Sequence, residues 1–202
     1  MSRLLLRTTG GTVTLPDPTT IMIDRANGGQ LVVHPPRRVW DRTALDAAEH
    51  AAWNALVSAT ARAMLEVLPQ LDGGCLNYWD AGNWALNEAA APAGAKRGRE
   101  HRVLHLHLVG RSPHSADASW QWGEAPYFPP FADRFAWASG KAPLTASECA
   151  AVVDRARDVL VERYAVTPAD ITAAALCGGC GYPTPGLPPE GRCDECAREA
   201  HA

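Results

Sequence analysis

This sequence of 202 residues lacks both a long apolar run and a strong excess of one charge. The N-terminal leucines, Leu4 to Leu6, are followed at once by Arg7, so they are too few for a signal-peptide core. No later segment has the length of apolar sequence that a bilayer-spanning helix needs. The formal net charge is -3, which favours neither an anionic membrane nor nucleic acid as a partner. We therefore expect a cytoplasmic protein with no membrane association.

Cysteine is scarce outside one short segment near the C-terminus. Cys75 and Cys149 are isolated, and small apolar roles suit them. The other four form two C-x2-C pairs separated by twelve residues: Cys177, Cys180, Cys193 and Cys196. Two disulfides or a redox pair fit a reducing compartment poorly, whereas four thiolates at this spacing can surround one metal ion. We predict structural Zn²⁺ here, with no open coordination position for catalysis.

The order of predicted elements indicates an α+β fold. Hairpins, helices and further strands alternate in a way that is typical of a mostly antiparallel sheet with helices packed on it. We predict one domain over residues 1–166 and a small module over residues 167–202, which contains a short helix and the four cysteines. The predicted strands span residues 4–7, 12–15, 21–24, 31–34, 75–86 and 102–109, and the predicted helices span residues 43–69 and 145–164.

Helix starts and turns are suggested by particular residues. Thr43 with Asp46, and Thr145 with Glu148, have the spacing of a capping box. Gly10-Gly11 and Asn27-Gly28-Gly29 have the composition of hairpin turns. Residues 111–143 show no clear periodicity, and a connection of that length is usually functional or covers another part of the fold. Its aromatic residues are expected either to pack the loop down or to stack on a base.

Two histidines occupy an otherwise apolar strand in "HRVLHLHLVGR", residues 101–111. Side chains alternate across a strand, so Leu104, Leu106 and Leu108 share one face while His105 and His107 share the other. Adjacent imidazoles can bind a metal, act as an acid–base pair, or supply a nucleophile with a helper. The same pattern also fits two half-exposed strand histidines that have no chemical role.

The segment "HLHLVGR" is similar to the signature of the histidine-triad superfamily of nucleotide hydrolases and transferases. The similarity extends over Ile21 to Tyr164: residues 22–49 resemble the family's hairpin, turn and long helix, and "LNYWDAGNWAL" resembles the strand that carries its phosphate- or ribose-binding asparagine. The resemblance implies a histidine-triad-like fold and a nucleotide phosphohydrolase or nucleotidyl transferase. In that chemistry the middle histidine attacks an α-phosphate to form a nucleotidyl-histidine, which water or another acceptor then releases.

The sequence departs from the family pattern because only His105 and His107 have the spacing of a triad. With Val103 in the first position, His105 is the nucleophile, His107 assists, and Arg111 falls where the family often has an arginine. With Val109 in the third position, His107 is the nucleophile instead. We prefer the first register because it places Arg111 where the family often has an arginine. The first residue of the motif can act through its backbone carbonyl, so a valine there is compatible with activity.

The resemblance also implies substrate contacts. Asn77 or Asn83 would lie near the ribose or phosphate, although Asn83 equally fits a turn after Gly82. Arg111 and Ser112 would contact the phosphate or the leaving group. The expected partner is a nucleotide or nucleotide-conjugate substrate. We also expect a homodimer, because dimers are common in the family and are the commonest oligomers in general.

Two other functions remain open on the sequence. The first is a nucleic-acid end-processing deadenylase that uses the zinc module for binding. The basic segment Lys96 to Arg102 favours it, whereas the acidic excess of the cysteine module makes a nucleic-acid partner the less expected one. The second is a non-catalytic, zinc-stabilised nucleotide-binding protein.

Overall fold

The fold is α+β and is built on an antiparallel sheet, as predicted. The computed structural model describes residues 2–80, 82–187 and 191–199. Within them, six strands pair in the order β4-β5-β3-β2-β1-β6, and every pairing is antiparallel. These strands are β1 (Arg3–Thr8), β2 (Gly11–Leu15), β3 (Gln30–His34), β4 (Cys75–Asp80), β5 (Leu106–Arg111) and β6 (Ile171–Thr172). A second sheet pairs β7 (Ala174–Leu176) with β8 (Pro183–Pro185).

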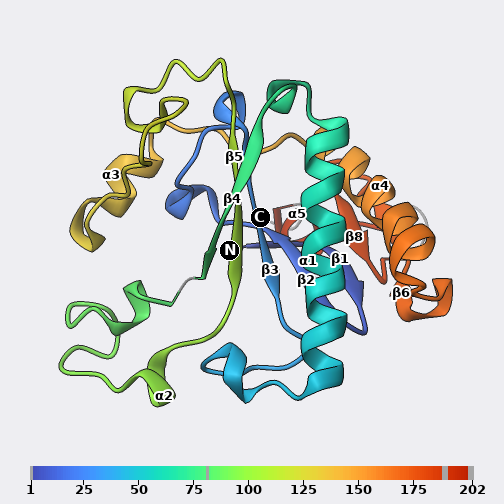
Figure 1. The fold of residues 1–202 in the computed structure, drawn as a ribbon, viewed down its shortest axis with the longest axis horizontal. Coiled ribbons are helices and arrows are strands. Elements are labelled where there is room, and N and C mark those ends of the chain that lie inside the picture. Colours follow the sequence, from blue (N-terminus) through green and yellow to red (C-terminus); the bar gives the residue numbers. More distant parts are fainter. Residues whose placement is uncertain (1, 81, 188–190, 200–202) are drawn as a thin grey trace.

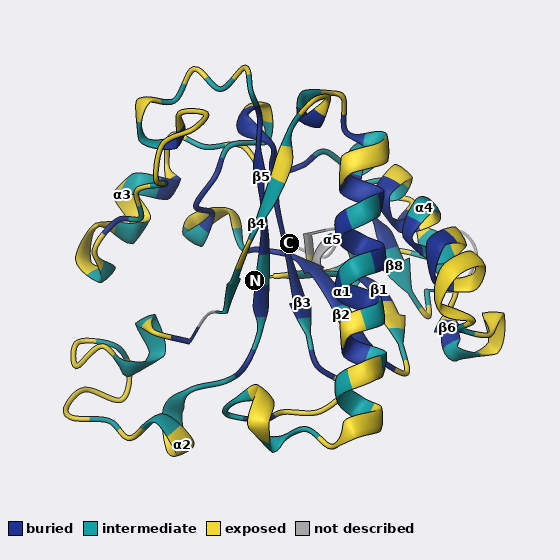
Figure 2. Cartoon of the chain, viewed as in Figure 1, coloured by how far each residue is buried: buried dark blue, intermediate teal, exposed yellow. Residues whose placement is uncertain are grey.

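Two long helices cover one face of the sheet. They are α1 (Ala47–Val67) and α4 (Ala146–Tyr164), which pack against each other and lie together on one side of the strands (Figure 1). Their inward side chains are buried, while their outer turns are exposed (Figure 2). No helix among the residues described here combines the length and the apolar character that crossing a membrane requires.

The predicted caps are correct for one long helix and wrong for the other. Thr145 and Glu148 form the capping box of α4, as expected. The box of α1 is formed instead by Asp46 and Glu49, because Thr43 lies in a separate turn of 3₁₀ helix. Both capping boxes pair an N-cap side chain with a glutamate three residues later, and so satisfy the first free amides of the helix.

Short helices occupy the connections. The α-helical ones are α2 (Gly98–His101), α3 (Arg134–Ala138) and α5 (Asp194–Glu199). The 3₁₀ helices are Pro18–Thr20, Arg25–Asn27, Arg42–Ala44, Pro69–Leu71, Trp84–Leu86, Ala118–Trp120, Phe131–Asp133 and Pro168–Asp170.

The predicted second hairpin is wrong, because only its second strand forms. β3 already has β2 on one side and β5 on the other, so no edge is left for residues 21–24. These residues run without regular structure into a 3₁₀ turn that the Asp24 side chain caps. Gly28 in this turn has a φ of 126° and lies so close to Gly110 that a Cβ would come within 2.5 Å of its backbone. Glycine at this position lets the turn cross the end of β5.

The predicted boundary after residue 166 is crossed by the main sheet. β6 comes from the C-terminal region and pairs with β1, and β8 packs against β1 and α4. The described part of the module is therefore joined to the core by hydrogen bonds and packing. Residues 188–190 and 200–202 of the predicted module lie outside the described residues.

The long segment after β5 covers part of the opposite face of the sheet. Trp120 is buried with Ile23 and Val109, and Phe128 packs against this small cluster. The Trp120 indole Nε1–H donates to the Gly110 carbonyl at 2.8 Å. The expectation that residues 111–143 cover another part of the fold is therefore correct for this stretch. The histidines of the same face lie outside this cluster and are half-buried.

Candidate functional site

Three imidazoles lie together on the face of the sheet opposite the long helices. As predicted, Leu104, Leu106 and Leu108 are buried in the core beneath the helices, while His105 and His107 project from the other face. Their ring centroids are 5.0 Å apart. His34, from the end of β3, stacks beside His105 with a centroid distance of 5.6 Å. Alternation along two neighbouring strands thus brings a third histidine to the predicted pair.

These histidines line a cavity of about 270 Å³. Its other walls are Ser2, Thr14, Pro16, Thr20, Met22, Val32, Trp79, Gly82, Asn83, Trp84 and Ala85. The described lining contains neither a lysine or arginine nor an aspartate or glutamate. The cavity is therefore apolar along its walls, and its polar groups are imidazoles, hydroxyls and one amide. Such a combination is typical of a site that orients a small ligand by a few polar contacts.

The position of the proton on His105 follows from its neighbour. Its Nδ1 lies 2.9 Å from the backbone carbonyl oxygen of Val103. A carbonyl oxygen can only accept, so Nδ1–H is the donor and the neutral ring has its lone pair on Nε2. Val103 therefore contributes through its backbone, which is the contact that the preferred register requires of the first motif position.

His107 is held differently. Its Nδ1 lies 2.6 Å from the side-chain Nε2 of Gln30, and its ring lies against Trp79 with a centroid distance of 5.5 Å. Since the amide nitrogen of glutamine is a donor, His107 Nδ1 is the acceptor. The two neighbouring rings thus use the same atom, Nδ1, in opposite hydrogen-bonding roles.

All three imidazoles resist protonation. Burial, with the neighbouring His105, lowers the pKa of His34 to about 4. Burial lowers the pKa of His107 to about 3, with further contributions from His105 and His34, and it also lowers the pKa of His105. Desolvation disfavours the charged ring, so the site holds neutral imidazoles at neutral pH. A neutral ring keeps a lone pair that can act as a nucleophile or base.

The predicted substrate residues are divided between two places. Asn83 is exposed and lines the histidine cavity. Asn77 and Arg111 line a different hollow beside Trp122, and the buried Arg111 donates to the carbonyls of Gln121 and Glu124. Ser112 is buried, and its Oγ accepts from the His114 amide. Substrate contact by these residues stays a prediction, since only Asn83 shares a cavity with the histidines.

Sequence reasoning overlooked His34 and Gln30. Both lie on the same face of β3, with Val32 between them in the alternation. The period-two pattern of "QLVVH" puts them on one face, but nothing local in the sequence shows that β3 pairs with β5. That pairing, which aligns Val32 with His107, is what brings them to the site.

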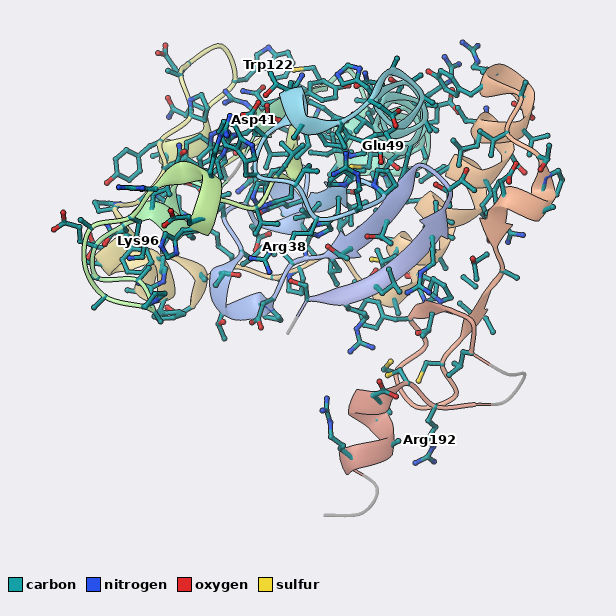
Figure 3. The ribbon with its side chains drawn as sticks, turned by 90° about the horizontal axis from the view of Figure 1, so that it is seen from below. Arg38, Asp41, Glu49, Lys96, Trp122 and Arg192 are labelled. Atoms are coloured by element: carbon teal, nitrogen blue, oxygen red, sulfur yellow. The ribbon has the colours of Figure 1, made fainter. Side chains whose placement is uncertain are left out.

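The four predicted metal ligands converge at a second place. The Sγ atoms of Cys177, Cys180, Cys193 and Cys196 all lie within 4.8 Å of one another, so this group could hold a metal ion. Figure 3 shows sulfur atoms gathered in the C-terminal segment that also carries Arg192. The amides of Gly179 and Cys193 donate to Cys177 Sγ at 3.4 Å and 3.2 Å. Such N–H···S contacts favour thiolates, as a metal site requires.

The two clusters can therefore do different chemistry. The cysteine cluster offers four convergent sulfur atoms, whereas the histidine cluster offers separately oriented nitrogen atoms at the wall of a cavity. The sequence matches no protein-family model, and it shows no significant similarity to a curated protein.

Proposed function

We propose that this protein is a nucleotide phosphohydrolase or nucleotidyl transferase of histidine-triad type, with His105 as its nucleophile. The observation that carries the proposal is the contact between His105 Nδ1 and the Val103 carbonyl at 2.9 Å. It holds the ring in the tautomer whose Nε2 lone pair is free. The ring also lines a cavity of about 270 Å³, so a ligand can reach it.

The reaction has two steps. The Nε2 lone pair of His105 attacks the α-phosphorus, an N–P bond forms, and the leaving group departs with the electrons of the broken bond and takes up a proton. An oxygen of water or another acceptor then attacks phosphorus, the N–P bond breaks, its electrons return to Nε2, and the acceptor loses a proton. Splitting one displacement into two in this way is what nucleophilic catalysis contributes.

The residues around His105 suit both steps. Phosphorylation of Nε2 leaves the ring cationic, and the Val103 carbonyl oxygen that accepts from Nδ1–H stabilises that charge. His107 assists by donating to a phosphate oxygen as negative charge develops there. His34 stacks beside His105 and limits its rotation. Trp79 and Trp84 supply apolar walls for a nucleoside.

We infer further that the metal of the cysteine cluster is structural Zn²⁺. A tetrahedral site with Zn–S bonds of ~2.3 Å has edges of roughly 3.8 Å between sulfur atoms. Cys180 Sγ and Cys193 Sγ are 3.9 Å apart, which is close to such an edge. Four thiolates complete the coordination, so the ion joins the two C-x2-C turns and leaves catalysis to the imidazoles.

The charges of the molecule support a small nucleotide substrate over a nucleic-acid end. In the basic segment, Arg102 pairs with Asp41 at 2.6 Å, and Lys96 donates to the Asn87 and Ala90 carbonyls at 2.5 Å and 2.9 Å. Lys96 and Arg192, in the cysteine module, also lie toward opposite ends of the molecule (Figure 3).

The test is turnover together with capture of the intermediate. Wild-type protein is incubated with dinucleoside polyphosphates, nucleotide sugars and nucleoside phosphoramidates, and mass spectrometry follows release of nucleoside monophosphate and the nucleotidyl adduct on the protein. We expect His105→Asn to lower turnover at least ~10³-fold and to abolish the adduct, because the amide nitrogen of asparagine has no free lone pair with which to attack phosphorus. His114→Asn, at an exposed histidine outside the cavity, is the matched control.

Three results would overturn this proposal. Unchanged turnover in His105→Asn would exclude His105 as the nucleophile, and an adduct on His107 would establish the alternative register. Binding of nucleotides without any release of monophosphate would identify a non-catalytic nucleotide-binding protein. Homodimer formation is a separate prediction, which light scattering coupled to gel filtration checks.

A further inference from the structure

Gln30 is a fully buried polar residue beside the cavity. It lies on β3, its exposed fraction is 0%, and both ends of its side-chain amide have partners. The Met22 backbone N–H donates to Gln30 Oε1 at 3.0 Å, and Gln30 Nε2 lies 2.6 Å from His107 Nδ1. A buried amide whose two ends are both satisfied has one stable orientation.

The orientation of this amide is determined by the Met22 contact. A backbone N–H can only donate, so the atom facing Met22 must be the oxygen, and the NH₂ group must face His107. The NH₂ group of glutamine can only donate, so His107 Nδ1 must be unprotonated. Since the ring is neutral, its proton lies on Nε2. His107 Nε2 has no hydrogen-bond partner within the part of the chain described here, and the ring lines the cavity.

We propose that Gln30 is a positioning residue that fixes His107 as an Nε2–H donor, the tautomer opposite to that of His105. The role of this tautomer in catalysis rests on the proposed function. The cavity then presents one imidazole with a free lone pair and, beside it, one imidazole with a free N–H. The first can attack phosphorus while the second donates to a phosphate oxygen. Met22 N–H, Gln30 and His107 form a chain of hydrogen bonds whose direction is set by a backbone amide.

This arrangement gives two identical side chains different roles: His105 presents a lone pair to the cavity, and His107 presents an N–H group. Without a fixed amide, a buried neutral imidazole can hold its proton on either nitrogen, and the tautomer with a proton on Nδ1 offers no donor at Nε2. A fixed donor requires no reorientation during the reaction, and such preorganised groups contribute most to electrostatic stabilisation. The Gln30–His107 contact, at 2.6 Å, is shorter than the contact of His105 with the Val103 carbonyl, at 2.9 Å, and that of His34 with Thr14, at 3.2 Å.

The test reads the tautomers directly and needs no substrate. Long-range ¹H–¹⁵N correlation NMR on ¹⁵N-labelled wild-type protein at pH 7 assigns protonated and unprotonated ring nitrogens, with His105→Asn and His107→Asn variants identifying the signals. We expect His107 to be protonated only at Nε2 and His105 only at Nδ1. We also expect a through-hydrogen-bond N–N coupling between Gln30 Nε2 and His107 Nδ1.

The variant Gln30→Met removes the amide while keeping a similar volume. We expect the coupling to vanish, the His107 ¹⁵N shifts to move toward those of mixed tautomers, and kcat to fall about 10- to 100-fold with KM changed less than about twofold. Gln121→Met, at an exposed glutamine, should change none of these. A proton on His107 Nδ1 in the wild type, or unchanged His107 shifts in Gln30→Met, would overturn the proposal.

The outcomes separate the two proposals. The wild-type tautomers decide the role of Gln30 even where Gln30→Met fails to fold. A protein that shows the expected tautomers but turns over no nucleotide conjugate refutes the proposed function and leaves the positioning role of Gln30 in place. Turnover through His105 together with a protonated His107 Nδ1 refutes the role of Gln30 alone.

Discussion

The histidine cluster and the cysteine cluster are both built from residue types that commonly ligate metals in proteins, yet their geometry differs. The four Sγ atoms of the cysteines lie within 4.8 Å of one another, close enough to surround one ion. The histidine rings have centroid distances of 5.0 Å and 5.6 Å, and each ring has a nitrogen near a different group: Thr14, Val103 or Gln30. Among the described residues, only the cysteines form a group that could hold a metal.

The difference comes from the backbone that carries each cluster. Cys177 and Cys180 lie in a short turn, and Cys193 and Cys196 lie at the start of α5. In a tight turn or a first helical turn, side chains three residues apart can approach the same ion. The histidines lie on or beside two paired strands, whose pleat keeps neighbouring side chains roughly parallel. Convergent donors are suited to a metal ion, whereas imidazoles that project side by side from a sheet into a cavity are suited to contacting a ligand there.

The largest expected difference between the two clusters is seen when one predicted metal ligand is replaced. Cys180→Ser should abolish stoichiometric zinc and lower the melting temperature by about 10 °C or more, because the free energy of metal binding contributes to folding. Zinc is measured by elemental analysis and melting by circular dichroism. Cys75→Ser, at an exposed cysteine outside the cluster, is the control. Full zinc content in Cys180→Ser would show that the four cysteines do not form the site.

Lowering the pH should destabilise the protein through the histidine cluster, with a smaller effect than the loss of a metal ligand. The pKa of His34 is about 4 in the folded protein, below its ordinary value of 6.5, so the unfolded chain binds more protons between these values. Stability therefore falls as pH drops through this window, by up to about 2 kcal/mol per such ring between pH 7 and pH 5. Urea unfolding at both pH values measures the loss.

The variant His34→Asn isolates the contribution of one ring. We expect its stability to fall less than that of the wild type between pH 7 and pH 5, because the depressed pKa of His34 no longer contributes. His114→Asn, at an exposed position, should retain the wild-type dependence. An identical loss in wild type and His34→Asn would contradict the burial of a neutral ring at this position.

The smallest expected effect concerns the apolar wall of the cavity. Trp84 lines the cavity, and base–aromatic stacking contributes about 1–3 kcal/mol, so Trp84→Ala should raise KM about tenfold with little change in kcat. Trp122→Ala is the matched control, because Trp122 is exposed and lines the hollow of Asn77 and Arg111 instead of the histidine cavity. Equal KM values in the two variants would indicate that the ligand does not use this wall.

Much of the fold and part of the site follow from local sequence patterns. Alternation in residues 103–109 predicted the opposite faces of the leucines and histidines, and the spacing of the cysteines predicted their convergence. Glycine turns and Thr145 predicted the first hairpin and the start of α4. Residues 21–24 were mispredicted as a strand, because their local composition contains no information about whether a partner edge is free.

By itself, the sequence determined which side chains share a strand face and which thiols can reach one ion, because both depend on residues close together in the chain. Only the tertiary structure decided that His34 and Gln30 stand beside His105 and His107. It also decided that the buried Arg111 faces a different hollow from the histidines. Strand pairing joins segments more than seventy residues apart, and the choice among pairings depends on the packing of the whole sheet.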